Sequence, residues 1–324
     1  MVGGLEILLE DLANALIEMK VEVSVITTTP NDQPDHFTFK VLRNPSFLTS
    51  VKEIKSADFY IQFNVSLKGI PAWSVSRRPL VLVFHNVVGS GRKEEVKQWI
   101  SDHLSVLNIG CSQYIAGHYK KNKAILNAYN ETLFANSVAW ETRSKDLIFV
   151  GRLVSDKGAE ILIKALAVLH QEGLRLALEV VGKGPEEEYL KRLTSELQLQ
   201  GYVSFHGEKP RSELGVLLNE HKIMVVPSLY KEPFGIVALE GLASGCFVIV
   251  SEYGGLIEAI GPCGFTFPNG DAQALAATIK RAFTDKAATH ACLAAAPGHL
   301  AHHSRGYVAQ KYLDALSDLK TKHT

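Results

Sequence analysis

Two glutamates, Glu232 and Glu240, stand eight residues apart across the end of an apolar strand and the start of a helix. Along a helix that separation is about 12 Å. It is too long for both carboxylates to act on one bond, because paired glycosidase carboxylates lie roughly 5–9.5 Å apart. The two side chains can instead hold the two ends of one long ligand. A surface helix with two solvated glutamates is the alternative that the residues alone leave open.

The segment between the glutamates predicts an anion site. Phe234, Gly235, Ile236 and Val237 open the expected helix, so their backbone N–H groups lie at its unsatisfied N-terminus. That end carries the positive pole of the helix dipole and suits a diphosphate. The local order therefore indicates a ligand with a sugar, a diphosphate and a ribose in line.

A second segment carries two cations. Arg152 and Lys157 follow the apolar run that ends at Val150 and precede a helix. Open α/β sheets bind ligands at the carboxyl ends of their strands. A planar guanidinium and a point-charge ammonium placed there can converge on one phosphate pair. The alternative is a solvated loop between strand and helix.

Weaker signals accompany these two segments. Gly182-Lys-Gly follows a strand, but Glu187 holds the position of a third glycine, so a dinucleotide fingerprint is not supported and a tight turn is the simpler interpretation. His85 ends an apolar strand, and a lone histidine there is as often structural as functional. His302 and His303 are expected in a solvated loop.

The elements that must position these residues alternate between short apolar strands and amphipathic helices, which predicts parallel α/β sheets. Asn127 is expected as a turn residue, and Ser112 as a helix cap. In the first half, strands are expected at 21–27, 59–63, 80–84, 105–111 and 124–127, after a helix over 5–19. In the second half, strands are expected at 147–150, 177–181, 203–206, 223–226 and 247–251, with helices between them.

The rhythm divides the chain into two doubly wound domains. Polar residues dominate at 135–146, which predicts a linker and a hinge. We therefore expect a first domain at 1–143, a second at 144–304 and a C-terminal helix at 305–324. Gly3 and Gly4 precede the first helix with no strand before them, so the first strand of that sheet is expected to be missing.

Composition excludes several classes of protein. The 324 residues include 34 Lys and Arg against 34 Asp and Glu, whereas a general nucleic-acid binder is usually basic. No apolar run approaches the ~18 residues that span a membrane, and no signal peptide is visible. Cys111, Cys246, Cys263 and Cys292 show no paired spacing, so neither a zinc site nor a disulfide framework is expected, and a cytoplasmic location fits.

Together these segments resemble the retaining GT-B glycosyltransferases of the large family that includes glycogen synthases, sucrose-phosphate synthases and bacterial polysaccharide glycosyltransferases. The resemblance covers nearly the whole second half, and the Glu-x7-Glu segment with Pro-Phe-Gly inside it is its most specific part. It rests on Gly151-Arg-Leu153 with Lys157-Gly158, Gly182-Lys-Gly-Pro185, Phe205-His-Gly207, Glu232-Pro-Phe-Gly235 with Glu240, and Gly254-Gly255.

The resemblance implies two Rossmann-like domains facing a central cleft, with the C-terminal helix crossing back to the first domain. It also implies roles for matching residues. Glu232 would contact the donor sugar and Glu240 the ribose. Arg152 and Lys157 would neutralise the departing diphosphate, helped by the N–H groups of the helix start, so no metal or other cofactor is implied. No Asp-x-Asp occurs in the chain. Further donor contacts are implied at Gly3, Gly4 and Lys209, and at His85, which would touch the sugar.

The implied activity is sugar transfer, with retention, from a nucleotide diphosphate sugar to a hydroxyl group. A UDP-sugar is favoured and GDP-mannose is next. The acceptor would be a glycan, a lipid-linked glycan or a small molecule, with no nucleic acid. Contact with the inner face of a membrane is expected only if Lys120, Lys121 and Lys123 form a surface patch, and a solvated helix end is the alternative.

Two departures concern the first half. The usual Asn-Gly-x-Asp reads Asn127-Ala-Tyr-Asn130, and the opening strand is absent. Phe247, in the second half, replaces a usual proline. Two other functions therefore stay open: a non-catalytic module that binds nucleotide sugars, and a non-hydrolysing nucleotide-sugar epimerase.

Overall fold

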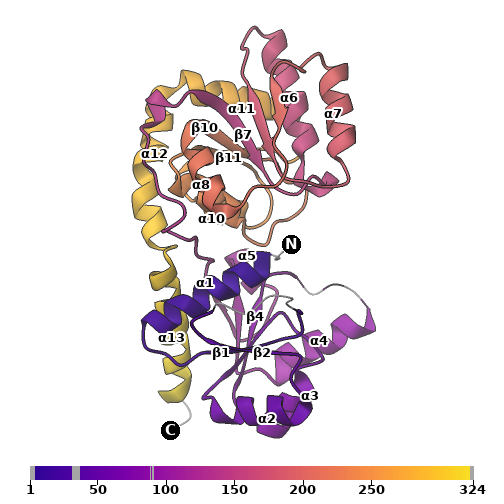
Figure 1. Cartoon of the computed structure of the whole chain (residues 1–324), viewed down its shortest axis with the longest axis vertical. Coiled ribbons are helices and arrows are strands. Elements are labelled where there is room, and N and C mark those ends of the chain that lie inside the picture. Colours follow the sequence, from indigo (N-terminus) through magenta and orange to yellow (C-terminus); the bar gives the residue numbers. More distant parts are fainter. Residues whose placement is uncertain (1–3, 31–36, 88, 90, 322–324) are drawn as a thin grey trace. The chain divides into compact units, whose positions relative to one another are not determined.

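The computed structural model describes residues 4–30, 37–87, 89 and 91–321 (Figure 1). The chain forms two compact units. Unit 1 comprises Met1–Ala128 with Arg305–Thr324, and unit 2 comprises Tyr129–Ser304. Both are α/β units with parallel sheets, as the alternation of strands and helices predicted. Within the described ranges, no helix combines the length and the apolar character that crossing a bilayer requires.

Unit 2 holds one six-stranded parallel sheet in the order β12-β11-β10-β7-β8-β9. Its strands are β7 (Lys145–Val150), β8 (Leu178–Val181), β9 (Val203–Phe205), β10 (His221–Val226), β11 (Phe247–Ser251) and β12 (Gly264–Phe267). Its helices are α6 (Ala159–Gln171), α7 (Glu187–Glu196), α8 (Arg211–Glu220), α9 (Ile236–Ala243), α10 (Leu256–Ile260), α11 (Ala272–Thr284) and α12 (Lys286–Ala301), with 3₁₀ turns at Trp140–Thr142 and Ser155–Lys157.

A large cluster of buried residues in unit 2 lies on one face of this sheet. Alternate residues of the central strands, such as Leu147 and Phe149 on β7 and Ile223 and Val225 on β10, pack there against α6 and α11. The strands are apolar almost throughout, because a parallel sheet covered by helices buries both faces.

Unit 1 holds a two-stranded parallel sheet, β1-β2, and a four-stranded parallel sheet, β3-β4-β5-β6. Its strands are β1 (Ser24–Thr27), β2 (Lys40–Arg43), β3 (Tyr60–Phe63), β4 (Leu80–Phe84), β5 (Leu107–Gly110) and β6 (Asn122–Ala124). Its helices are α1 (Gly4–Glu18), α2 (Phe47–Ser56), α3 (Ile70–Ser76), α4 (Arg92–His103), α5 (Gln113–Ala116) and α13 (Arg305–Thr321).

The sequence analysis did not foresee β2 in unit 1 or β12 in unit 2, and β6 begins two residues before the strand expected at 124–127. β2 has only four residues, two apolar ones between two cations, so it shows no strand periodicity that could be identified from the sequence. Ser112 caps α5 as expected, since its hydroxyl accepts from the N–H of Ile115 at 3.0 Å.

The C-terminal helix α13 belongs to unit 1, as the family resemblance led us to expect. It contacts α1, beside which it lies in Figure 1. Val308, Tyr312 and Ala315 on one side of α13 enter the same buried cluster as Val81 and Val83 of β4.

Residues 129–143 belong to unit 2, so the division falls at Ala128 and not at the predicted residue 143. Arg143 is 3% exposed, and its guanidinium donates to the carbonyl oxygens of Leu218 (3.1 Å), His221 (2.8 Å) and Ser244 (2.7 Å). It also donates to the Val138 carbonyl at 3.0 Å. These bonds fix the polar segment to unit 2, where a sequence reading saw only a lapse in the apolar rhythm and expected a hinge at 135–146.

Candidate active site

The two predicted motifs of unit 2 meet where the strand order of the sheet reverses. β7 and β10 are hydrogen-bonded neighbours in the middle of the sheet, yet the chain leaves β7 toward β8 and leaves β10 toward β11. The loop after β7 carries Arg152 and Lys157, and the loop after β10 carries Glu232. This switch point is where doubly wound sheets bind their ligands.

Lys157 and Glu232 form an ion pair across that point. Lys157 Nζ donates to Glu232 Oε1 at 2.5 Å, and Ser228 Oγ donates to the same oxygen at 2.7 Å. The two charged side chains are 22% and 12% exposed, so the pair is largely shielded from water. The sequence predicted both residues but not their direct contact.

The close approach of the two loops depends on Gly158. Its φ is +71°, and a Cβ at this position would meet the Pro227 carbonyl oxygen at 2.0 Å. The carbonyl of Asp156 accepts from the N–H groups of Leu229 at 2.8 Å and Tyr230 at 3.3 Å. Only glycine lets the cation loop lie this close to the strand end that leads to Glu232.

A second glycine supports Glu232 from the other side. Gly254 forms an isolated parallel bridge with Glu232, and the N–H of Gly255 donates to the Glu232 carbonyl at 2.7 Å. Gly254 has φ +70°, and a Cβ at this position would lie 2.4 Å from the backbone carbonyl oxygen of Glu232. The Gly254-Gly255 pair therefore positions the backbone of the acidic loop.

The start of α9 lies directly after this loop. Gly235 precedes the helix with φ +110°, and Phe234 beside it is 1% exposed. Ile236 and Val237 are the first residues of α9, so their N–H groups have no acceptor within the helix. The predicted anion-binding N–H groups thus follow Glu232 in the structure.

Arg152 and Lys209 are the exposed cations of the predicted set. Arg152 is exposed, and within the described ranges its guanidinium has no hydrogen bond or ion pair. Lys209 Nζ lies 3.3 Å from Glu213 Oε2 on the first turns of α8. Arg152 is therefore the cation of the switch point that is available to an anion.

The Gly182-Lys-Gly184 segment forms a tight turn, the simpler of the two interpretations that the sequence allowed. The N–H of Leu153 donates to the Lys183 carbonyl at 2.9 Å. Cβ atoms at Gly182 and Gly184 would meet the carbonyl oxygens of Gly151 and Leu153 at 1.8 and 2.1 Å. These glycines pack one tight turn against the cation loop.

Glu240 lies on α9 and is 7% exposed. Its Oε1 accepts from Nη2 of Arg211, the first residue of α8, at 2.8 Å. The solvated glutamate that the sequence left open is therefore excluded at this position. No motif pointed to Arg211, because a single arginine at the start of a helix is unremarkable in a sequence.

The expectation that His303 is solvated is wrong. His303 is 1% exposed, and its ring centroid lies 5.6 Å from that of Phe234 and 4.7 Å from that of His299. The turn after α12 that carries His303 therefore packs against Phe234. His302 is exposed, as predicted.

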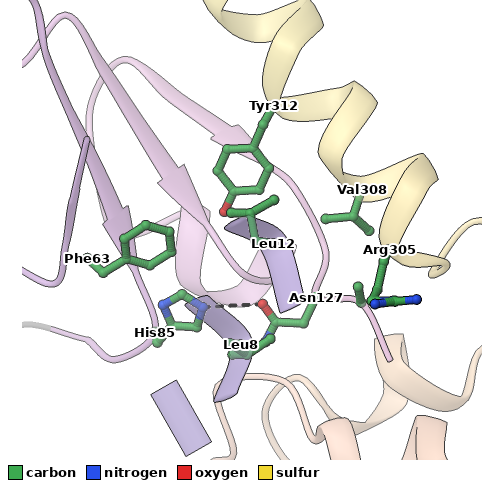
Figure 2. A pocket seen from close by; sticks show the side chains of 9 residues that line it. Leu8, Leu12, Phe63, His85, Asn127, Arg305, Val308 and Tyr312 are labelled. Carbon is green, nitrogen blue, oxygen red and sulfur yellow. Dashed lines mark hydrogen bonds between the residues drawn. The ribbon is translucent and has the colours of Figure 1, made fainter. Parts of the chain in front are cut away.

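In unit 1, His85 faces a small cavity of about 20 Å³ (Figure 2). Its Nε2 lies 3.3 Å from Asn127 Oδ1, and Asn64 Oδ1 accepts from its backbone N–H at 3.0 Å. Burial lowers the pKa of His85 to about 4, so the ring is neutral at pH 7. Asn127, expected only as a turn residue, is its partner. The cavity is lined by Leu8, Leu12, Phe63, His85, Asn127, Ala128, Arg305, Val308 and Tyr312.

The remaining predicted residues of unit 1 divide into two groups. Gly3 lies outside the described residues, and Gly4 begins α1. The lysines each have a partner: Lys120 pairs with Asp102 at 3.3 Å and Lys123 with Asp318 at 3.7 Å, while Lys121 donates to a backbone carbonyl. No group of three or more His, Cys, Asp or Glu side chains in the described ranges could hold a metal ion.

Residues 130–298, just over half of the 324 residues, match the family described as Glycosyl transferases group 1. The chain belongs to this family. It is 37% identical over 153 residues to an uncharacterized glycosyltransferase of Methanocaldococcus jannaschii, and the aligned region covers 43% of this chain and 38% of the relative. It is 34% identical over 149 residues to a glycogen synthase of Mycobacterium tuberculosis, which covers 45% and 36%. The chain thus spans less than two fifths of either relative's length.

A solved structure gives the fold. The crystal structure of Anabaena HepE in complex with UDP superposes with a TM-score of 0.83 over 98% of this chain and 96% of that one, at 21% identity. The fold is therefore the GT-B fold that the motifs of the second half predicted. The family model and the curated relatives agree with the family that the Glu-x7-Glu and cation-loop segments indicated.

Two residues of the site escaped the sequence analysis besides Asn127. Ser228 is four residues before Glu232, and its hydroxyl donates to the same Glu232 carboxylate oxygen as Lys157. A hydroxyl two residues after the end of the buried strand β10 was a usable signal for Ser228. Arg211 had no such signal, because its contact with Glu240 joins residues 29 positions apart.

Proposed function

We propose that this protein is a retaining glycosyltransferase that moves a sugar from a UDP-sugar to a hydroxyl group of a growing glycan. The observation that carries the proposal is the Lys157–Glu232 ion pair at the switch point of unit 2, with Arg152 exposed on the same loop. The UDP complex of the solved relative and the glycogen synthase among the curated relatives support this donor and this product class.

The proposed electrostatic role belongs to the cation loop. As the bond between sugar and diphosphate breaks, negative charge grows on the diphosphate and positive charge on the sugar. Fixed cations aimed at the leaving group stabilise that charge without reorganising during the reaction. Arg152 and Lys157 would supply the cations, and the N–H groups of Ile236 and Val237 would supply oriented dipoles.

Glu232 would bind the donor sugar through its hydroxyl groups. The Glu232 oxygen contacted by Lys157 and Ser228 is Oε1, and a carboxylate has acceptor capacity at both of its oxygens. Its negative charge also favours the positively charged sugar of the transition state. Glu240 would accept hydrogen bonds from the ribose, and Lys209 would lie near the base.

In unit 1 we propose that His85 is a neutral hydrogen-bond partner for a sugar hydroxyl. Its lowered pKa, about 4, leaves one ring nitrogen a donor and the other an acceptor at pH 7. Its Nδ1 is buried without a hydrogen-bond partner within the described residues. An orphaned ring nitrogen beside a cavity is suited to a hydroxyl group of a ligand.

We further propose that transfer needs no metal, because Arg152 and Lys157 already provide two positive charges at the diphosphate. Retention would follow if the leaving phosphate itself accepts the proton of the incoming hydroxyl on the same face of the sugar. The acceptor that we propose is a compound of glycan synthesis that offers a free hydroxyl group.

The decisive experiment begins with a thermal-shift panel of UDP-glucose, other UDP-sugars and GDP-mannose, because a ligand of the folded state raises its apparent stability. The ligand that binds is then followed by NMR with and without hydroxyl acceptors. We expect a product with the donor's anomeric configuration. An epimerised donor would identify an epimerase, and binding with neither transfer nor donor hydrolysis would identify a binding module.

Glu232→Gln sharpens this experiment, since it keeps the shape and the hydrogen-bonding capacity of the side chain but removes its charge. We expect transfer to fall by about 10²–10³-fold, the range found for a lost electrostatic contact to a transition state. Glu258→Gln, on the helix after Gly255, is the matched control outside the ion pair. Full activity of the Glu232 variant would overturn the role given to this residue.

A further inference from the structure

The carboxylate of Glu240 is held by a chain of contacts that begins two elements away. Gly215 on α8 is the first of them, because a Cβ there would lie 2.2 Å from the Leu133 carbonyl oxygen and 3.7 Å from the ring of Phe134. The missing side chain lets the segment around Phe134 pack directly against α8. Phe134 itself is 1% exposed and is therefore fixed in place.

Arg211 uses that ring as a platform. Its guanidinium carbon lies 5.3 Å from the centroid of Phe134, within the distance at which a cation is attracted to an aromatic face. From there its Nη2 reaches Glu240 Oε1 at 2.8 Å. The side chains of Arg211 and Glu240 are 24% and 10% exposed, so a short bond between them is shielded from competing water.

The stacking limits the freedom of the guanidinium, and the guanidinium in turn limits that of the carboxylate. A planar fork that is already oriented loses little entropy when it makes a hydrogen bond. A carboxylate with one oxygen held in this way presents its other oxygen in a defined direction. Two vicinal hydroxyl groups, as on a ribose, are recognised best by an acceptor with that kind of fixed orientation.

We propose that Arg211 is a positioning residue that orients Glu240 toward the ribose hydroxyl groups of the nucleotide and thereby sets the preference for a ribonucleotide over a deoxyribonucleotide. This inference rests on the proposed function, because it assumes that a nucleoside diphosphate binds beside α9. Arg211 acts through Glu240 and touches no reacting atom.

The test compares UDP with 2′-deoxy-UDP by isothermal titration calorimetry on the full chain. We expect the wild type to prefer UDP, and Arg211→Ala to weaken UDP binding by about tenfold or more, as for a hydrogen bond to a charged group. Binding of 2′-deoxy-UDP should change by less than about threefold. Arg211→Lys should recover part of the preference, because it restores the charge but not the planar fork.

A double-mutant cycle separates positioning from general support of the fold. In a Glu240→Gln background, Arg211→Ala should weaken UDP binding by much less than it does alone, since residues that act through one contact are not additive. Arg281 offers a matched control, because its guanidinium also stacks on a phenylalanine, Phe265, at 4.1 Å and pairs with Asp285 at 3.6 Å on α11. Arg281→Ala should leave both affinities unchanged.

The outcomes distinguish the inference from the function beneath it. Equal losses for UDP and 2′-deoxy-UDP in Arg211→Ala, or no loss for either, would overturn the positioning role while leaving the glycosyltransferase proposal intact. A wild type that binds UDP no better than 2′-deoxy-UDP would do the same. A wild type that binds no nucleoside diphosphate at all would overturn both. Circular dichroism melts of each variant confirm that the affinities refer to folded protein.

Discussion

Replacing Arg143 by methionine should destabilise unit 2, because this side chain joins residues 129–143 to three other elements. Methionine keeps much of the aliphatic stem and removes the guanidinium. The loss falls most heavily on the backbone carbonyl of Ser244. This residue is fully buried, and its carbonyl has no other donor in the described part of the chain. Such an orphaned acceptor costs about 1–3 kcal/mol.

The other backbone carbonyls that accept from Arg143 lose less. The Leu218 carbonyl keeps the backbone N–H of His221 as a donor, which leaves the single Sγ–H of Cys246, 3.6 Å away, for the His221 carbonyl. Val138 is 36% exposed, so water can replace its partner. Each of these three then costs about 0.5–1.5 kcal/mol. Burial lowers the pKa of Arg143, which shows that burying its charge is itself unfavourable, and removing that charge offsets part of the loss.

The net effect is a destabilisation of about 3 kcal/mol. Unit 2 spans Tyr129–Ser304, and for a domain of that size this corresponds to a fall in Tm of roughly 6–12 °C. Trp140 reports on the same region, because its Nε1 donates to the Lys222 carbonyl at 2.8 Å. Urea unfolding followed by fluorescence, with Trp73 and Trp99 of unit 1 changed to phenylalanine, therefore measures unit 2 alone.

Arg192→Met is the control for this measurement, because Arg192 is exposed on α7 and a surface change of this kind stays within about ±0.5 kcal/mol. If Arg143→Met lowers the unfolding free energy by less than about 1 kcal/mol, the guanidinium is not what holds residues 129–143 to unit 2. The assignment of this segment to unit 2 would then need another physical basis.

Three further predictions concern the two sites. Lys157→Met should lower kcat/KM for transfer by about 10²–10³-fold in a donor-consumption assay, because Glu232 and the leaving group lose one cation; a loss below tenfold would contradict that role. Gly158→Ala should destabilise unit 2 by more than 1 kcal/mol in the urea assay, since its Cβ would meet the Pro227 oxygen at 2.0 Å at a φ of +71°; unchanged stability would show that the loops can separate freely. His85, whose pKa is lowered to about 4, binds fewer protons in the folded than in the unfolded state. Stability should therefore fall as pH drops from about 6.5 to about 4, and His85→Gln should remove that part of the pH dependence in melts between pH 4 and 7.

The sequence predicted unit 2 more fully than unit 1, and the reason lies in the kind of signal each carries. The strands of unit 2 are continuous apolar runs, and Glu232, Glu240, Arg152 and Lys157 are charged residues at fixed positions next to them. Local pattern and chemistry coincide there, so both the elements and the candidate site could be identified.

What the sequence could not supply were contacts between distant positions. Arg211 contacts Glu240 because α8 and α9 both pack against β10 in the folded chain. No spacing in the sequence encodes that contact. The burial of His303 and the partnership of Asn127 with His85 are of the same kind. The segment before Arg143 was assigned to the wrong unit because a polar stretch held by one buried guanidinium has the composition of a linker.

The return of α13 to unit 1 has a consequence for biosynthesis. Unit 2 is a continuous stretch of chain, whereas unit 1 needs both the first 128 residues and a helix that begins at Arg305. During translation the ribosome therefore finishes unit 2 before it delivers Val308, Tyr312 and Ala315 to the core of unit 1. Until α13 has been made, the strands of unit 1 expose the apolar face that this helix covers. Nascent unit 1, and any fragment that ends before residue 305, is accordingly the species that chaperones and proteases should engage.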